Sequence, residues 1–303
     1  MLGYECFAPK KGNNLAVLNA SLVIELIHSC LLIHDDIMDQ DVIRRGRDAF
    51  HVQFANMHSE GQLKGSSAQY GISMGIDAGD VGTFLALNHL NQQDISATKS
   101  RRAQDVITKT FLNTAIGQAQ DIALQYEDAV TEEQIMAVYT YKTALYTVVC
   151  PLQLGAVLGT AADTDLYSLY QYGLPVGQAF QIVDDLLGIC GTEEELGKPV
   201  GSDIKEAKKT LVMLKALESA NVADRDFLRS VLGQELPDNK NLRDERIEHI
   251  QAVVRSSGAV TYCENLANKL ANQAKSYVSR ITSDPRLQNL LEDFADYMVK
   301  RQS

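Results

Sequence analysis

The sequence predicts an all-α protein, and three observations support this. Only six prolines and twenty glycines interrupt 303 residues, so breaks between elements are few. Alanine, leucine, glutamine and glutamate, all good helix formers, are abundant. No segment shows the alternation of apolar and polar residues that a half-buried strand produces. We therefore expect long helices packed around a sizeable core.

The elements follow from this pattern in chain order. Residues 14–44 carry apolar side chains at helical spacing on several sides and predict a long central helix. Residues 56–69 are polar and contain glycine and serine, which predicts a loop before helices resume near residue 72. Further helices, bounded by Gly, Pro, Asn or Asp, are predicted at 96–126, 132–149, 152–161, 165–190, 203–218, 222–234, 242–256, 258–281 and 286–300.

No internal repeat or long linker divides the chain, so we expect a single domain over residues 1–303. The uncharged stretch 144–162 approaches the length of a membrane span. Its Gln153, proline and glycines favour a helix buried on all sides instead. The first residues lack the layout of a secretory signal. We expect no transmembrane segment.

Composition argues against several classes of function. The net charge is −11 and no basic run is present, which argues against a nucleic-acid partner because phosphate backbones require a basic footprint. Six histidines without an HxxxH pair or a neighbouring cysteine cluster do not indicate zinc. No CxxC pair is present, which predicts reduced thiols and a cytoplasmic protein. The five cysteines are Cys6, Cys30, Cys150, Cys190 and Cys263.

The most informative stretch is LLIHDDIMDQDVIRRG, residues 31–46. On a helix, Asp35 and Asp39 lie one turn apart on one face, with Asp36 beside them. Such close charges in an apolar helix repel unless a cation neutralises them, and hard divalent cations favour oxygen ligands. The alternative is a solvated acidic face, which the flanking LLI disfavours. Magnesium is therefore the predicted ligand.

A second pair, Asp184 and Asp185, interrupts the apolar run FQIVDDLLGI. Two such helices facing each other would hold several Mg²⁺ ions that also bind the phosphates of a substrate. Arginine forks and lysine ammonium groups suit phosphate oxygens. Such side chains recur at Arg44, Arg45, Lys142, Lys198, Lys208 and Lys209.

Six motifs, in the same order, resemble those of the trans-isoprenyl diphosphate synthases. They are ELIHSCLLIHDDIMDQDVIRRG, YGISMGIDAGD, GQAQDI, YKTALYT, AFQIVDDLLGI and LGKPVGSDIKEAKKT. The resemblance implies an all-α isoprenoid-synthase bundle that forms a homodimer and depends on Mg²⁺. It also implies head-to-tail condensation of an allylic diphosphate with isopentenyl diphosphate.

The resemblance also assigns roles to single residues. The implied Mg²⁺ ligands are Asp35, Asp39 and Asp184, with Asp36 and Asp185 in support. The implied contacts to the allylic diphosphate are Arg44, Lys142, Thr143, Gln181 and Lys198, to which we add Lys208. His28 and Arg45 resemble the contacts to isopentenyl diphosphate, although His28 also fits a core histidine bonded to a backbone carbonyl. The expected catalytic set is Asp35, Asp36, Asp39, Asp184, Lys142 and Lys198.

The sequence departs from the family pattern in two places. Gly188 stands where the second motif usually has its last aspartate. The family's upstream Gly-Lys-Arg segment does not precede the first motif, and MLGYECFAPKKGN resembles the stretch that follows that segment. We therefore expect the domain to lack the family's first helix or helices, and Lys10 and Lys11 do not stand in the context needed to replace the missing cations.

The first motif has the uninserted DDxxD form, and the residues before it predict product length. Cys30 and Leu31 lie about one turn deeper than Asp35, where an aromatic ring would block chain growth. Neither is aromatic, so we expect a C15 allylic substrate to fit and the product to be geranylgeranyl diphosphate or longer. Ile27, two turns down, is expected in the floor of the pocket or in ordinary core.

Three alternatives remain at this point. A terpene cyclase of the same fold also uses aspartate-rich motifs, but RRG and the lysine-bearing loop favour two diphosphate sites. A non-catalytic partner subunit fits Gly188 and the missing basic segment, whereas the intact leading aspartates argue against it. A metal phosphohydrolase using His34 with Asp35 lacks the further spaced ligands of such a site.

Overall fold

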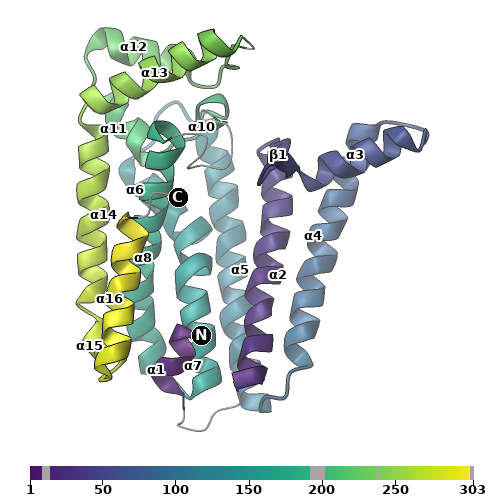
Figure 1. Cartoon of the computed structure of the whole chain (residues 1–303), viewed down its shortest axis with the longest axis vertical. Helices are drawn as coiled ribbons and strands as arrows, with labels where there is room; N and C mark the ends of the chain where they lie inside the picture. Colours follow the sequence, from purple (N-terminus) through teal and green to yellow (C-terminus); the bar gives the residue numbers. More distant parts are fainter. Residues whose placement is uncertain (9–13, 192–201, 238, 301–303) are drawn as a thin grey trace. The chain divides into compact units, whose positions relative to one another are not determined.

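The computed structural model describes residues 1–8, 14–191, 202–237 and 239–300, and most of these residues are helical (Figure 1). Their contacts divide the chain into two compact units. The first unit spans residues 10–104, together with Met1, and the second contains residues 2–9 and 105–303. The helix α5 (Ala97–Gln125) begins in the first unit and continues into the second.

The described residues of the first unit contain three whole helices, a small hairpin and the beginning of α5. Its elements are α2 (Asn14–Met38), β1 (Ile43–Arg44), β2 (Arg47–Asp48), α3 (Phe50–Glu60) and α4 (Ser67–Asn91). Glycines on α4 allow the neighbouring helices to approach closely. A Cβ added at Gly79 would lie 2.1 Å from the His34 ring, and one at Gly75 would lie 2.6 Å from Ile37. The face of α2 that carries His34 and Ile37 is thereby packed against α4.

The hairpin replaces the end of the helix predicted at 14–44. The helix α2 ends at Met38, and the chain turns back through Arg45 (φ 53°) and Gly46 (φ 73°). Two consecutive left-handed residues form a two-residue hairpin loop whose twist matches that of the flanking strands. Glycine adopts the left-handed conformation readily. The strands pair with Arg44 opposite Arg47. The predicted loop at 56–69 is also shorter, since α3 runs to Glu60 and Ser66 caps α4.

One described helix, Leu15–Met38, is long and apolar enough to cross a membrane by length and composition. Only 33% of its most apolar window is buried. Core helices of soluble proteins meet the same two criteria, so this finding alone does not place the helix in a membrane. The stretch 144–162 is not a candidate: it is divided between two elements, and most of its apolar residues are buried, as predicted.

The second unit is built around α8 (Asp163–Cys190), whose packing partners include η1 (Tyr139–Val149) and α14 (Ala259–Lys275). Its core includes Ile182, Leu211 and Leu228, each at most 1% exposed. The other elements of this unit are α1 (Leu2–Phe7), α6 (Glu132–Val138), α7 (Cys150–Gly159), α10 (Ser202–Lys205), α11 (Leu211–Ser219), α12 (Val222–Val231), α13 (Lys240–Ser256), α15 (Val278–Ile281) and α16 (Pro285–Lys300).

Two of the predicted helices are interrupted in this unit. The helix predicted at 203–218 breaks into α10 and α11 because Ala207 adopts a left-handed conformation (φ 52°). Thr210 then caps the first turn of α11 with its side chain. The helix predicted at 258–281 ends at Lys275 and is followed by the short α15. The first break matters for function because it places Lys208 and Lys209 in a turn.

Candidate active site

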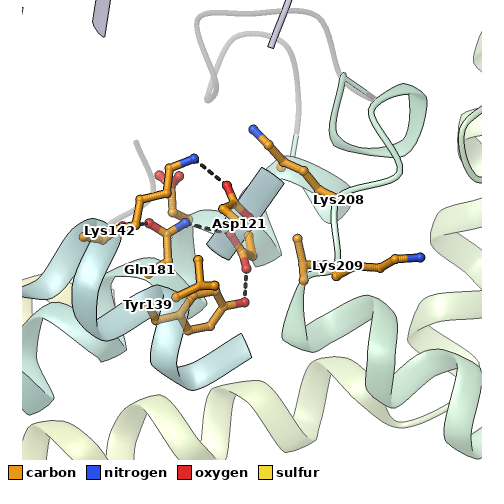
Figure 2. A pocket seen from close by; sticks show the side chains of 12 residues that line it. Asp121, Tyr139, Lys142, Gln181, Lys208 and Lys209 are labelled. Atoms are coloured by element: carbon orange, nitrogen blue, oxygen red, sulfur yellow. Dashed lines mark hydrogen bonds and ion pairs between the residues drawn. The ribbon is translucent and has the colours of Figure 1, made fainter. Parts of the chain in front are cut away.

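A pocket in the second unit brings together residues of α5, α6, η1, α8 and the turn before α11 (Figure 2). Five of the residues that the sequence assigned to substrate or metal line it: Lys142, Thr143, Gln181, Asp184 and Lys208, together with Asp185, which was expected to support the metal ligands. The other lining residues are Asp121, Val138, Tyr139, Gly188, Lys209 and Thr210. The pocket therefore combines carboxylates with ammonium groups, as a site for a metal-bound phosphate requires.

A π-helix supplies Lys142 and Thr143 to this pocket. The segment η1 follows α6 without a break, and such wider turns occur often at functional sites. The helix α5 packs against the backbone of η1 at Gly117, where an added Cβ would lie 2.3 Å from the backbone nitrogen of Lys142. This close approach fixes the start of the Lys142 side chain.

The Lys142 ammonium group is paired with Asp121. Its Nζ lies 2.5 Å from Asp121 Oδ2, and the two side chains are 22% and 17% exposed. The two residues point toward one another, while Lys208 extends toward the same end of the pocket and Lys209 points away (Figure 2). Sequence reasoning assigned no role to Asp121, although it is the aspartate of the quoted motif GQAQDI. The motif was the available signal.

The two aspartates of the second motif have different environments. Asp184 is exposed and lines the pocket, whereas Asp185 is only 6% exposed. Gln181 Nε2 donates to Asp185 Oδ1 at 2.8 Å, and the Tyr139 hydroxyl donates to Asp185 Oδ2. Burial, followed by the charge of Asp185, raises the pKa of Tyr139 well above its ordinary value, so this hydroxyl keeps its proton. Asp184 is thus the carboxylate that the pocket presents.

Gly188 lines the same pocket one turn after Asp184. An aspartate at this position would add a second carboxylate on the same face of α8. The pocket therefore has one carboxylate fewer on this wall than the usual motif provides.

The first motif lies in the first unit and repeats the arrangement of the second. Asp35 and Asp39 are partly exposed, whereas Asp36 is 3% exposed. Arg44 Nε donates to Asp36 Oδ1 at 2.6 Å, and its guanidinium group lies 3.1 Å from Asp41 Oδ2. Burial raises the pKa of Asp36, and the hydrogen bond from Arg44 acts in the opposite direction.

His28 and Arg45 also belong to the first unit. His28 is half-buried, and this burial lowers its pKa; Glu25 acts against the shift, and the charges of Arg45 and Arg44 add to it. His28 is therefore a neutral hydrogen-bonding group near pH 7. Arg45 is exposed at the hairpin turn. His34, considered for a phosphohydrolase site, instead bonds to the Ile76 carbonyl on α4 at 3.1 Å.

The residues expected to set product length lie on α2. Ile27 and Cys30 are 1% and 6% exposed, and Leu31 is half-buried. An added Cβ at Gly82 of α4 would lie 2.4 Å from Cys30 Sγ. Lys198, the remaining predicted site residue, lies outside the described residues.

Neither motif builds a complete metal site from protein atoms. Within residues 1–8, 14–191, 202–237 and 239–300, no group of three His, Cys, Asp or Glu side chains is close enough to hold an ion. Mg²⁺ is commonly held by one or two carboxylates, with substrate phosphates and water completing its shell. The exposed Asp184 and the partly exposed pair Asp35 and Asp39 fit this mode of binding.

The family model for polyprenyl synthetase matches residues 1–250. The chain belongs to the polyprenyl synthetase family. The resemblance to the trans-isoprenyl diphosphate synthases is thereby confirmed, and the chain is an enzyme of this type.

Relatives and solved structures agree with this assignment. The chain is 32% identical over 293 residues to geranylgeranyl diphosphate synthase of Saccharolobus solfataricus, covering 96% of this chain and 81% of the relative. It is 32% identical over 299 residues to geranylfarnesyl diphosphate synthase of Natronomonas pharaonis, covering 98% and 79%. A geranylgeranyl pyrophosphate synthase from Corynebacterium glutamicum, crystallised with isoprenyl diphosphate and magnesium, has a similar fold, with a TM-score of 0.91 and 28% identity, covering 99% and 85%. The predicted all-α isoprenyl-synthase fold is confirmed.

Proposed function

We propose that the protein condenses an allylic diphosphate with isopentenyl diphosphate head to tail, and that the product is geranylgeranyl diphosphate or longer. The pocket in which Asp184 stands with Lys142 and Lys208 carries this proposal. One carboxylate beside two ammonium groups suits a diphosphate that arrives with a divalent metal. Relatives named for geranylgeranyl and geranylfarnesyl diphosphate support the choice of product.

The divalent metal is proposed to be Mg²⁺, with Asp35 and Asp39 as ligands in the first unit and Asp184 as a ligand in the second. When bound, Mg²⁺ supplies positive charge that stabilises the negative charge developing on the departing diphosphate. Lys142 and Lys208 hold the same diphosphate through ammonium groups. Asp121 keeps the Lys142 ammonium group in place through their 2.5 Å contact. Lys198 is proposed to add a further cation from outside the described residues.

The remaining residues hold and orient the substrates. Thr143 donates to Gln181 Oε1 at 2.8 Å, so both polar side chains are fixed at the pocket wall. His28 and Arg45 are proposed to bind isopentenyl diphosphate, with neutral His28 donating one hydrogen bond and Arg45 contributing charge. The allylic carbocation left after diphosphate departs is attacked by the isopentenyl double bond. The released diphosphate then accepts the proton that is lost.

Product length is proposed to depend on the small and aliphatic side chains that precede the first motif. Ile27, Cys30 and Leu31 are aliphatic or small, and the two turns of α2 before Asp35 contain no Phe, Tyr or Trp. A growing prenyl chain therefore meets no phenyl, phenol or indole ring from these positions.

The assembly and the location follow the family resemblance. We propose a cytoplasmic homodimer in which residues 1–303 form one isoprenyl-synthase domain. A non-catalytic partner subunit is the second candidate, and Gly188 is the observation that favours it, because it removes one carboxylate from the pocket wall.

Incubation of the purified protein with Mg²⁺, labelled isopentenyl diphosphate and allylic diphosphates of five, ten or fifteen carbons tests the proposal. We expect labelled products of twenty carbons or more by chromatography. Asp35→Ala and Asp184→Ala should abolish turnover and retain the helical circular dichroism. Asp163→Ala, which removes an exposed carboxylate from the start of α8, should retain turnover.

Absence of product with every allylic substrate would reject the catalytic proposal and favour the partner subunit. Farnesyl diphosphate as the sole end product would reject the proposed chain length alone. Full turnover in the Asp35→Ala variant would contradict the role of the first motif.

A further inference from the structure

A chain of hydrogen bonds runs beneath the pocket of the second unit. The Leu211 amide donates to the Tyr139 hydroxyl oxygen at 2.9 Å, and that hydroxyl donates to Asp185. The other oxygen of Asp185 accepts from Gln181, whose own oxygen accepts from Thr143. Each link is a definite donor and acceptor pair, and both arms of the chain end on Asp185, which accepts from Tyr139 on one side and from Gln181 on the other.

Tyr139 joins three elements in this chain. It stands at the first position of η1, it bonds to Asp185 of α8, and it receives the amide of the first residue of α11. The neighbours of these groups line the pocket: Asp184 precedes Asp185, and the segment 208–210 precedes Leu211. A single hydroxyl therefore connects the wall that presents the carboxylate to the turn that carries two lysines.

Water does not easily replace the Tyr139 hydroxyl as the partner of Asp185 and of the Leu211 amide. Tyr139 is 5% exposed and Asp185 is 6% exposed, so water does not readily replace the hydroxyl. Removal of the hydroxyl takes one hydrogen-bond partner from the buried Leu211 amide and one from Asp185, and losing a partner at a buried polar group costs more than the hydrogen bond itself provides. The turn at 206–210 is also held in an unfavourable conformation, since Ala207 has a φ of 52°. The bond to Leu211 restrains this turn at its end.

We propose that Tyr139 is a positioning residue for the diphosphate site, which keeps Lys208 and Asp184 at the spacing that a metal-bound diphosphate requires. Tyr139 acts through Asp185 and through the amide of Leu211, and it does not contact the substrate. The inference rests on the proposed function, because it assigns the pocket to a diphosphate.

The variant Tyr139→Phe tests this role because it removes only the hydroxyl oxygen. Tyr172→Phe is its matched control: Tyr172 is fully buried in the same unit, and its hydroxyl donates to the Leu291 carbonyl at 2.6 Å. Tyr139→Phe loses two buried hydrogen bonds and Tyr172→Phe loses one, so both variants should lower the unfolding temperature. Tyr172 does not line the pocket.

Two measurements separate positioning from stability. Calorimetric titration with inorganic diphosphate in the presence of Mg²⁺ should show binding about tenfold weaker in Tyr139→Phe and unchanged in Tyr172→Phe. Hydrogen exchange at the Leu211 amide should be faster only in Tyr139→Phe. In turnover assays, Tyr139→Phe should raise KM for the allylic diphosphate more than it lowers kcat.

Asp185→Asn provides a second variant, since it keeps the shape of the side chain and removes the negative charge to which Tyr139 and Gln181 donate. It should also weaken diphosphate binding. Wild-type diphosphate affinity in Tyr139→Phe, or an unchanged exchange rate at Leu211, would overturn the inference and leave the proposed function intact. A wild-type protein that binds no diphosphate would overturn the proposed function and the inference together.

Discussion

Asp36 and Asp185 occupy corresponding places in the two aspartate motifs. Each follows a more exposed aspartate, each is buried, and each accepts a hydrogen bond from another element. Successive residues of an α-helix point about 100° apart, so the two aspartates of each pair have different surroundings. The more exposed residue of each pair is the proposed metal ligand, and the buried residue holds Arg44 in one case and Tyr139 in the other. Single-residue identity in the sequence cannot separate these roles, because both are written as Asp.

The conformation of Ala207 leads to a prediction about stability. Its φ of 52° is unfavourable for a residue with a Cβ and is readily adopted by glycine. Ala207→Gly should therefore raise the free energy of unfolding by roughly 0.5–1 kcal/mol, measured by chemical denaturation. Ala252→Gly, at an exposed position within α13, is the control and should lower it by about 1 kcal/mol. A loss of stability in Ala207→Gly would contradict the left-handed conformation.

A second residue-scale prediction concerns product length. Cys30 is 6% exposed on α2, and its thiol occupies the place that a side chain at Gly82 would take. A phenyl ring at position 30 is much larger than the thiol and should project into the path of the growing chain, so Cys30→Phe should shorten the main product by at least one five-carbon unit. Cys30→Ala, which makes the side chain smaller, should leave the product at its wild-type length or longer. Chromatography of the dephosphorylated products distinguishes the outcomes, and an unchanged product in Cys30→Phe would contradict the role of this position.

The elements of the site differ from the sequence predictions where the backbone leaves ordinary helix geometry. Residues 132–149 were predicted as one helix, and the structure divides them into α6 and the π-helix η1. Apolar periodicity does not distinguish the two, because a π-helix arises from an extra residue in a turn that packing requires. The hairpin after Met38 was missed because the aspartate motif continues the helical pattern up to the turn. Gly46 was the local signal for this turn, and the prediction of a helix up to residue 44 did not use it.

The packing of α5 against η1 gives an element-scale prediction. A Cβ at Gly117 would lie 2.3 Å from the Lys142 nitrogen and 2.6 Å from the Tyr141 carbonyl carbon, both of which are backbone atoms. Gly117→Ala should therefore displace η1, lower the free energy of unfolding by about 1–3 kcal/mol and reduce kcat/KM through Lys142. Thermal unfolding and steady-state kinetics measure the two effects.

Gly173→Ala is the comparison on α8. Its Cβ would lie 3.1 Å from a methyl group of Val149, at the other end of η1. A methyl group yields more easily than backbone, so this variant should cost less stability and retain kcat/KM. Equal kinetic losses in the two variants would show that general loosening of the unit, rather than the position of Lys142, is responsible.

At the scale of the whole molecule, the sequence predicted the family and the fold because both depend on spaced motifs and on helix-forming composition. Residues 1–250 match the family model, and the described structure is almost entirely helical. The sequence also predicted five residues that share a pocket, among them Lys142 and Asp184, which lie 42 positions apart. It did not predict the partners Asp121 and Tyr139. The motif GQAQDI marked Asp121 without its partner Lys142, and the role of Tyr139 arises from tertiary contacts, which leave no local pattern.

The charge of the molecule predicts how its ligands stabilise it. The chain carries a net charge of −11, and each motif offers only one or two accessible carboxylates. Diphosphate alone meets a negative protein, and Mg²⁺ alone finds an incomplete shell, so each should bind weakly without the other. Together they should raise the free energy of unfolding by about 2.7 kcal/mol when the free concentration of Mg²⁺-bound diphosphate is about one hundred times its Kd for the protein.

Thermal unfolding with Mg²⁺, diphosphate, both, and both with excess chelator measures this coupling. We expect a rise of several degrees only with both ligands, and chelator should abolish it. Asp184→Ala should lose the rise, whereas Asp163→Ala should keep it, because Asp163 lies at the start of α8 and does not line the pocket. A full rise with diphosphate alone would mean that the lysines suffice to bind it, and the carboxylates would then need another explanation.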